Sequence, residues 1–141
     1  SVKDTNKIAK ELAKEILITK QKSKKATVIG LSGELGAGKT TFTKNFAKAL
    51  GVKETVKSPT FNLMKVYRTK NGNLIHIDAY RLSNSKEAEA IDWADLVKDP
   101  NNIIVVEWAE NIKKVFPKQY FWLNLCHMEK NQRGIDIKLV K

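Results

Sequence analysis

The sequence has one cysteine and three prolines, and no apolar run approaches the roughly 20 residues that a membrane-spanning helix needs. Cys126 has no partner for an internal disulfide, and it follows an alternating apolar run, 121–125, where a small buried hydrophobic residue would sit. No His or Asp stands at a spacing that would make it a nucleophile. The first residues, 1–4, lack the apolar core of a secretory signal. We therefore expect a cytoplasmic protein without a membrane segment or a catalytic thiol.

Arginine is also scarce, although the chain is strongly basic. Of its 26 basic residues only Arg68, Arg81 and Arg133 are arginines, and the formal net charge is +11. Clustered lysines attract nucleic acids and other acidic partners, and the densest cluster lies within residues 20–25. Lysines can equally be spread over solvated faces that bind nothing. The composition leaves both interpretations open.

The length of 141 residues and the hydrophobic fraction of 42% predict a single domain over residues 1–141. Apolar residues recur at helical spacing over 8–17 and 42–50, which predicts two amphipathic helices. Short β-branched runs at 26–31 and 103–106 predict strands that are buried on both faces.

Two hairpins are also indicated. Asn71-Gly72 separates two strand-like segments, 61–68 and 74–77, and predicts a hairpin with a type I′ turn. Alternating apolar residues from Tyr120 and again up to Leu139 predict a second hairpin around a polar turn at 129–132. We therefore expect an α/β fold in which helices flank a mixed, mostly parallel sheet with antiparallel hairpins.

Two further helical segments complete the expected fold. Ser85 caps a helix that contains Ile91 and Leu96. A short helical segment covers 111–116 and ends at Pro117.

A complete phosphate-binding motif lies between a predicted strand and a predicted helix. Residues 33–40 match the P-loop pattern G-x-x-x-x-G-K-[ST]. The glycines let backbone N–H groups surround an anion, the following helix adds the positive end of its dipole, and Lys39 reaches the outer phosphates. Thr40 would ligate Mg²⁺, and Thr41 would meet an inner phosphate. The predicted ATP-binding residues are Gly33, Glu34, Leu35, Gly36, Ala37, Gly38, Lys39, Thr40 and Thr41.

A P-loop ATPase also needs a carboxylate at the end of a buried strand to hold Mg²⁺ directly or through water. Glu107 ends the run 103–106, and Asp78 ends the run 74–77. We rank Glu107 first as the metal ligand, because its strand is wholly apolar and hence central, beside the strand that enters the P-loop. Asp78 is assigned to a water-mediated metal contact or to orienting the attacking water. Lys39, Asp78 and Glu107 are therefore the predicted catalytic residues.

Four separated segments resemble the bacterial TsaE family of ATPases, which takes part in threonylcarbamoyladenosine (t6A) modification of tRNA. They are the P-loop at 33–41, Val56–Phe61 (VKSPTF), His76–Leu82 (HIDAYRL) and Val106–Trp108 (VEW). Many NTPases share the P-loop, but the set is specific, and the resemblance spans nearly the whole chain. One departure is Ala109-Glu110, where the family commonly has proline or glycine.

The resemblance implies a Mg²⁺-dependent ATPase that binds the TsaB and TsaD subunits and resets their complex between rounds of tRNA modification. It implies that Thr40 and Glu107 bind Mg²⁺ and that Asp78 supports hydrolysis. It also implies that Arg133 lies near the nucleotide and that Thr5 contacts the adenine side. The lysine-rich surface could contact tRNA.

Other residues of these segments have open roles. By strand alternation the ring of Trp108 points away from the side that Glu107 faces. It lines the nucleotide pocket or a partner surface, or it belongs to the core as large aromatic residues often do. Ser58 and Thr60 offer hydroxyls that could sense a γ-phosphate. His76 is assigned to the fold rather than to proton transfer.

The rival hypothesis is a small-molecule P-loop kinase, which also combines a P-loop, a buried sheet and a short chain. Such kinases clamp phosphates with several arginines on a mobile lid, and the three arginines here form no lid-like insertion. A basic nucleic-acid-binding module is a third hypothesis. We favour the ATPase.

Overall fold

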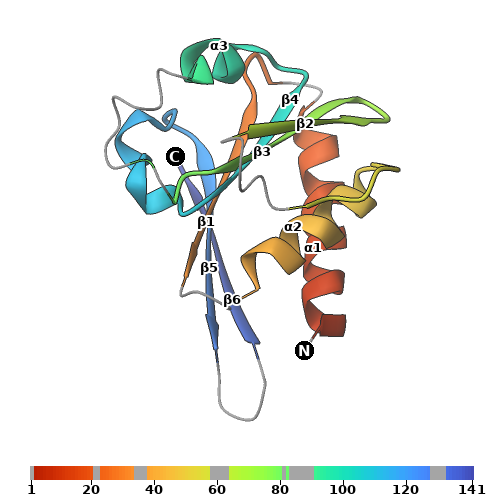
Figure 1. Ribbon diagram of the computed structural model, residues 1–141. Coiled ribbons are helices and arrows are strands. Elements are labelled where there is room, and N and C mark those ends of the chain that lie inside the picture. The colour runs from red at the N-terminus through yellow and green to blue at the C-terminus, as the bar shows by residue number, and fades with distance from the viewer. Residues whose placement is uncertain are drawn as a thin grey trace.

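A six-stranded sheet forms the centre of the protein, in the order β2-β3-β4-β1-β5-β6 (Figure 1). The computed structural model describes residues 2–20, 23–33, 38–57, 64–80, 82, 91–127 and 133–141, with the backbone alone at 2–5, 20, 126–127 and 133–134. The strands are β1 Thr27–Gly33, β2 Met64–Thr69, β3 Gly72–Asp78, β4 Asn102–Glu107, β5 Tyr120–His127 and β6 Arg133–Val140.

The four inner strands, β3, β4, β1 and β5, run parallel. The edge strands β2 and β6 are each antiparallel to their neighbour. The predicted mixed and mostly parallel sheet with two antiparallel hairpins is therefore confirmed. So is the central position of β4, which lies directly beside β1.

Helices cover both faces of the sheet. On one face α1 (Val2–Lys20) and α2 (Lys39–Ala49) pack against each other and against the strands (Figure 1). The other face is covered by α3 (Trp93–Lys98) and by two 3-10 turns, Ala109–Asn111 and Lys113–Val115. Within the described part of the chain, no helix is both long enough and apolar enough to cross a membrane.

The strands build two cores because successive side chains point to opposite faces. In β4, Ile103 and Val105 pack toward α1 and α2, whereas Ile104 and Val106 pack toward α3. All six residues of this strand are buried. The same alternation directs Glu107, at the carboxyl end of β4, toward α2.

The first hairpin forms as predicted, but its turn differs. Thr69 pairs with Gly72, so the turn residues are Lys70 and Asn71. A type I′ turn needs a positive φ at both of its central residues, and neither of these two has one. The type I′ prediction is therefore wrong. The conformational freedom of glycine is used instead at the first residue of β3, where Gly72 has a φ of 144°. The predicted strand residues 61–63 lie outside the described residues.

The predicted helix that begins at Ser85 lies outside the described residues as far as residue 90. Asp92 has a left-handed backbone conformation with a φ of 56°, and α3 begins directly after it. Because such a residue cannot continue a right-handed helix, Ile91 lies outside α3, contrary to the prediction, while Leu96 lies within it. The segment 111–116 forms short 3-10 turns rather than an α-helix.

Candidate nucleotide site

Lys39 begins α2 at the carboxyl end of β1. It follows Gly38, whose φ of 97° favours glycine. The Lys39 Nζ donates a hydrogen bond to the backbone carbonyl of Gly33 at 2.6 Å and lies 3.5 Å from the centroid of the Trp108 ring. The lysine head group is therefore held at the base of the predicted phosphate loop, between the end of β1 and the residue that follows β4.

Burial and three acidic side chains influence the pKa of Lys39 in opposite directions. Lys39 is only 6% exposed, and burial lowers the pKa of its amine below the ordinary lysine value. The negative charges of Glu110, Glu107 and Asp78 oppose that shift and raise the pKa. One buried lysine thus lies among several carboxylates at the carboxyl edge of the sheet. A divalent cation would complement this excess of negative charge.

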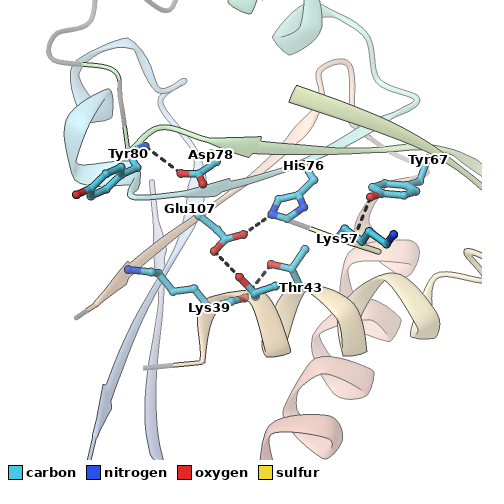
Figure 2. A network of polar contacts seen from close by, with 9 residues as sticks. Lys39, Thr43, Lys57, Tyr67, His76, Asp78, Tyr80 and Glu107 are labelled. Atoms are coloured by element: carbon cyan, nitrogen blue, oxygen red, sulfur yellow. Dashed lines mark hydrogen bonds and ion pairs between the residues drawn. The ribbon is translucent and has the colours of Figure 1, made fainter. Parts of the chain in front are cut away.

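Glu107 joins three elements of the fold (Figure 2). Thr40 Oγ1, in the first turn of α2, donates a hydrogen bond to Glu107 Oε1 at 3.1 Å. His76 Nε2, from the neighbouring strand β3, contacts Glu107 Oε2. Both oxygens of the carboxylate are therefore engaged, which restricts its orientation.

Asp78 lies beside Glu107 at the end of β3, because the two residues are paired in the parallel ladder. Asp78 Oδ1 accepts a hydrogen bond from the backbone N–H of Tyr80 at 3.0 Å (Figure 2). Asp78 is half-buried, unlike the fully buried Glu107. The structure thus brings both predicted carboxylates to one edge of the sheet and leaves Asp78 the more accessible of the two.

Trp108 packs on the face of the sheet opposite to the one that Glu107 faces, as predicted. The residue lies after the end of β4 with a left-handed φ of 57° and packs against the core that α3 covers. Its ring lies over the Lys39 amine and contacts the exposed ring of Tyr80, with centroids 5.0 Å apart. The ring of Trp108 therefore points away from the side that Glu107 faces, as predicted, and it also covers the amine of Lys39.

Other predicted residues are only partly described. Thr41 lies in the first turn of α2 and is half-buried. The structure describes the backbone but not the side chain of Thr5 and of Arg133. The predicted site residues that lie outside the described residues are Glu34, Leu35, Gly36, Ala37, Ser58 and Thr60.

The chain leading to the predicted γ-phosphate sensors is anchored to the sheet. The backbone N–H of Lys57 donates a hydrogen bond to the Tyr67 hydroxyl at 3.3 Å (Figure 2). Tyr67 belongs to β2 and is buried in the core beneath α1 and α2. Its hydroxyl therefore ties the segment that ends at Lys57 to the edge of the sheet.

The contact of His76 with Glu107 was not predicted from the sequence, which led us to assign His76 to the fold. A usable signal was present, since His76 and Asp78 are two residues apart and so share one face of β3. What the sequence does not specify is the register between β3 and β4. That register sets Asp78 opposite Glu107 and brings His76 within reach of the same carboxylate.

The oxygen donors at this edge suit Mg²⁺. Mg²⁺ prefers oxygen ligands and is usually held by one or two protein groups together with water and phosphate oxygens. Thr40 and Glu107 already place a hydroxyl and a carboxylate side by side. In the ranges that the structure describes, no three His, Cys, Asp or Glu side chains cluster to hold a metal by themselves. The residues therefore fit a cation that shares its shell with a nucleotide.

The fold and the site together define a class of protein. The central strand β1 leads through the P-loop motif into α2, and a carboxylate at the end of the adjacent parallel strand meets the hydroxyl that follows the motif lysine. This is the arrangement of a P-loop NTPase.

Comparison with known proteins narrows the class to a family. The profile of the family described as "Threonylcarbamoyl adenosine biosynthesis protein TsaE" matches residues 1–135. The chain is 34% identical over 139 residues to the "tRNA threonylcarbamoyladenosine biosynthesis protein TsaE" of Rickettsia typhi, covering 98% of this chain and 90% of the relative. It is 44% identical over 115 residues to the protein of the same name in Aquifex aeolicus, covering 80% and 75%.

The solved structure of Bacillus subtilis YdiB is similar as well. It superposes with a TM-score of 0.73 at 30% sequence identity, covering 100% of this chain and 82% of that one. The chain belongs to the TsaE family, and with it to the proteins of t6A biosynthesis.

Proposed function

We propose that this protein is a Mg²⁺-dependent ATPase, acting as one domain over residues 1–141 in the cytoplasm. It binds the TsaB–TsaD complex and uses ATP hydrolysis to support t6A modification of tRNA. The threonylcarbamoyl transfer itself takes place on another subunit. Family membership supports the pathway, and the geometry of the site supports the chemistry.

The observation that carries the proposal is the hydrogen bond from Thr40 Oγ1 to Glu107 Oε1 at 3.1 Å. It joins the residue after the P-loop lysine to the end of the strand beside β1. In P-loop NTPases a Ser or Thr hydroxyl and a strand-end carboxylate hold Mg²⁺, which would neutralise negative charge on the phosphates. We assign these two roles to Thr40 and Glu107.

The remaining groups act on the phosphates and on water. The backbone N–H groups of residues 33–38 and the Lys39 amine hold the phosphate chain, and Thr41 meets an inner phosphate. Asp78, half-buried beside Glu107, orients the attacking water. Trp108, Thr5 and Arg133 are assigned to the nucleotide pocket.

Hydrolysis by the isolated protein is expected to be slow. P-loop NTPases reach high rates when an arginine stabilises the charge that develops in the transition state. Arg68 is the one arginine whose side chain the structure describes, and it is exposed on the edge strand β2, two strands away from β4. We therefore expect the TsaB–TsaD complex to raise the rate.

The test is a comparison of ATPase rates with and without the TsaB–TsaD complex. Lys39→Ala should abolish hydrolysis in both conditions. Lys44→Ala is the matched control, since it removes an exposed lysine from the same helix. Equal rates with and without the complex, or no association in a pull-down with and without ATP, would refute the assignment to TsaB–TsaD.

The same assay separates the ATPase from a small-molecule kinase. An ATPase forms ADP with water alone, whereas a kinase forms ADP in proportion to an added acceptor. ADP formation that requires a small-molecule acceptor would replace our proposal with the kinase.

The proposed tRNA contact is tested separately. Lys24 and Lys25 are exposed between α1 and β1, so replacing both by glutamate should weaken tRNA binding. Binding through lysines should also weaken steeply as salt concentration rises. If the double variant binds tRNA as the unmodified protein does, these lysines do not form the contact.

A further inference from the structure

His76 contacts Glu107 but has no role in the proposed chemistry. Its ring is fully buried at 0% exposure, and its Nε2 contacts Glu107 Oε2. Its other ring nitrogen, Nδ1, is buried and has no hydrogen-bond partner among the described residues. Buried polar atoms are usually paired, and of the two ring nitrogens only Nε2 has a partner within the described part of the chain. The polar interaction that the structure shows for His76 is directed at Glu107 alone.

The sheet explains how the contact arises. His76 and Asp78 share the face of β3 that looks toward α2, and Glu107 lies on the same face of β4. Asp78 is opposite Glu107 in the ladder, and His76 lies two residues earlier in β3, opposite Val105. His76 therefore contacts the Glu107 carboxylate from the side that is further from the carboxyl edge of the sheet. Since a carboxylate only accepts hydrogen bonds, the Nε2 of His76 carries the hydrogen that it donates.

This contact divides the two oxygens of Glu107 between two tasks. The terminal torsion of a glutamate is broad and poorly restricted by itself. With Oε2 held by His76 on the inner side, Oε1 is the oxygen that faces Thr40 in α2. The hydroxyl and carboxylate oxygens that would meet a cation are therefore set before any cation arrives.

We propose that His76 is a positioning residue for the magnesium site: by holding Oε2 it keeps Oε1 of Glu107 beside the Thr40 hydroxyl. The inference rests on the proposed function, in which Thr40 and Glu107 hold Mg²⁺. Groups that orient metal ligands in this way commonly affect metal affinity by about 10- to 100-fold. His76 acts through Glu107 and touches neither the nucleotide nor the cation.

The test uses two amide substitutions that differ in reach. His76→Gln places an amide nitrogen near the position of Nε2, so it can still donate to Glu107. His76→Asn has the same chemistry, but its shorter side chain reaches only to the position of Nδ1. The measurement is the affinity for ADP by isothermal titration calorimetry in EDTA and over a series of MgCl₂ concentrations, which requires no turnover.

We expect three results. All three proteins bind ADP in EDTA within about twofold of one another, because the phosphate loop is unchanged. His76→Asn needs at least about tenfold more Mg²⁺ than the unmodified protein for half of the magnesium effect. His76→Gln stays within about threefold of the unmodified protein, because the donor is preserved.

Contrary outcomes distinguish a failure of the proposed function from a failure of the positioning role of His76. If ADP affinity of the unmodified protein does not respond to Mg²⁺, the proposed function fails and this inference fails with it. If the unmodified protein responds but His76→Asn follows the same Mg²⁺ curve, only the positioning role is refuted. A parallel loss in both amide variants, or a loss that is equally large in EDTA, would also refute it, because either result indicates a role in the fold alone.

Discussion

Replacing Gly33 by alanine is expected to destabilise the protein strongly. Gly33 ends β1 with a φ of 145°, which side-chain-bearing residues rarely adopt, and a Cβ here would lie 2.2 Å from the backbone carbonyl oxygen of Leu125. Leu125 is the partner of Gly33 in the adjacent parallel strand β5. The collision would therefore involve the backbone of the sheet, which cannot rotate away as a side chain can.

The size of the effect follows from two contributions. A residue held at an unfavourable φ costs about 1–3 kcal/mol. Moving β1 away from β5 at this point sacrifices backbone hydrogen bonding worth about 1 kcal/mol. We therefore expect Gly33→Ala to lower the free energy of unfolding by about 3 kcal/mol. For a chain of 141 residues, each kcal/mol shifts Tm by about 3 °C, so Tm should fall by about 10 °C.

Thermal unfolding followed by circular dichroism measures this fall, and Gly51→Ala provides the matched control. Gly51 also has a positive φ, 88°, but a Cβ there would meet the Lys70 side chain at 3.0 Å, and that flexible chain can move. This variant should lose about 1 kcal/mol, or about 3 °C in Tm. If Gly33→Ala melts no lower than Gly51→Ala, the reasoning from the close approach of β1 and β5 is wrong.

Three further predictions follow from the site and its surroundings. Tyr67→Phe removes the acceptor of the Lys57 N–H, so Tm should fall by about 3 °C in the same experiment; an unchanged Tm would show that this anchor adds no stability. Asp78→Asn should lower kcat for ATP hydrolysis at least about tenfold while ADP affinity stays constant, because Asp78 is proposed to act on water. The exposed Asp136→Asn is its control, and a loss of ADP affinity in Asp78→Asn would contradict the role. Burial lowers the pKa of Lys39, so the amine loses the charge that attracts phosphate at a lower pH than an ordinary lysine does. ADP affinity measured by calorimetry between about pH 7 and pH 10 should therefore fall as pH rises, and a flat profile would argue against a phosphate contact by this amine.

Much of the fold could be predicted because it depends on short, contiguous patterns. The apolar run before Glu107 required a strand buried on both faces, and β4 is indeed such a strand beside β1. The P-loop motif between a strand and a helix indicated where β1 ends and α2 begins. The alternation in the last part of the chain predicted the hairpin of β5 and β6.

The errors share a different origin. The helix predicted from Ser85 through Ile91 and the turn at Asn71 were each interpreted from a rule about regular structure, and each depends on the φ of one or two residues. Asp92 has a left-handed backbone that interrupts the predicted helix, and neither Lys70 nor Asn71 has the positive φ of a type I′ turn. Contacts with the surrounding structure select such backbone conformations, and the local sequence does not predict them.

The sequence by itself determined the chemical class of the site, because a phosphate loop, its lysine and the hydroxyl after it are neighbours along the chain and need only a strand before them and a helix after them. Only the tertiary structure decided how distant groups complete that site. The register of β3 against β4 brings His76 to Glu107, and a left-handed residue after β4 turns Trp108 onto Lys39. Register and backbone handedness are set by packing over the whole sheet, which no single segment encodes.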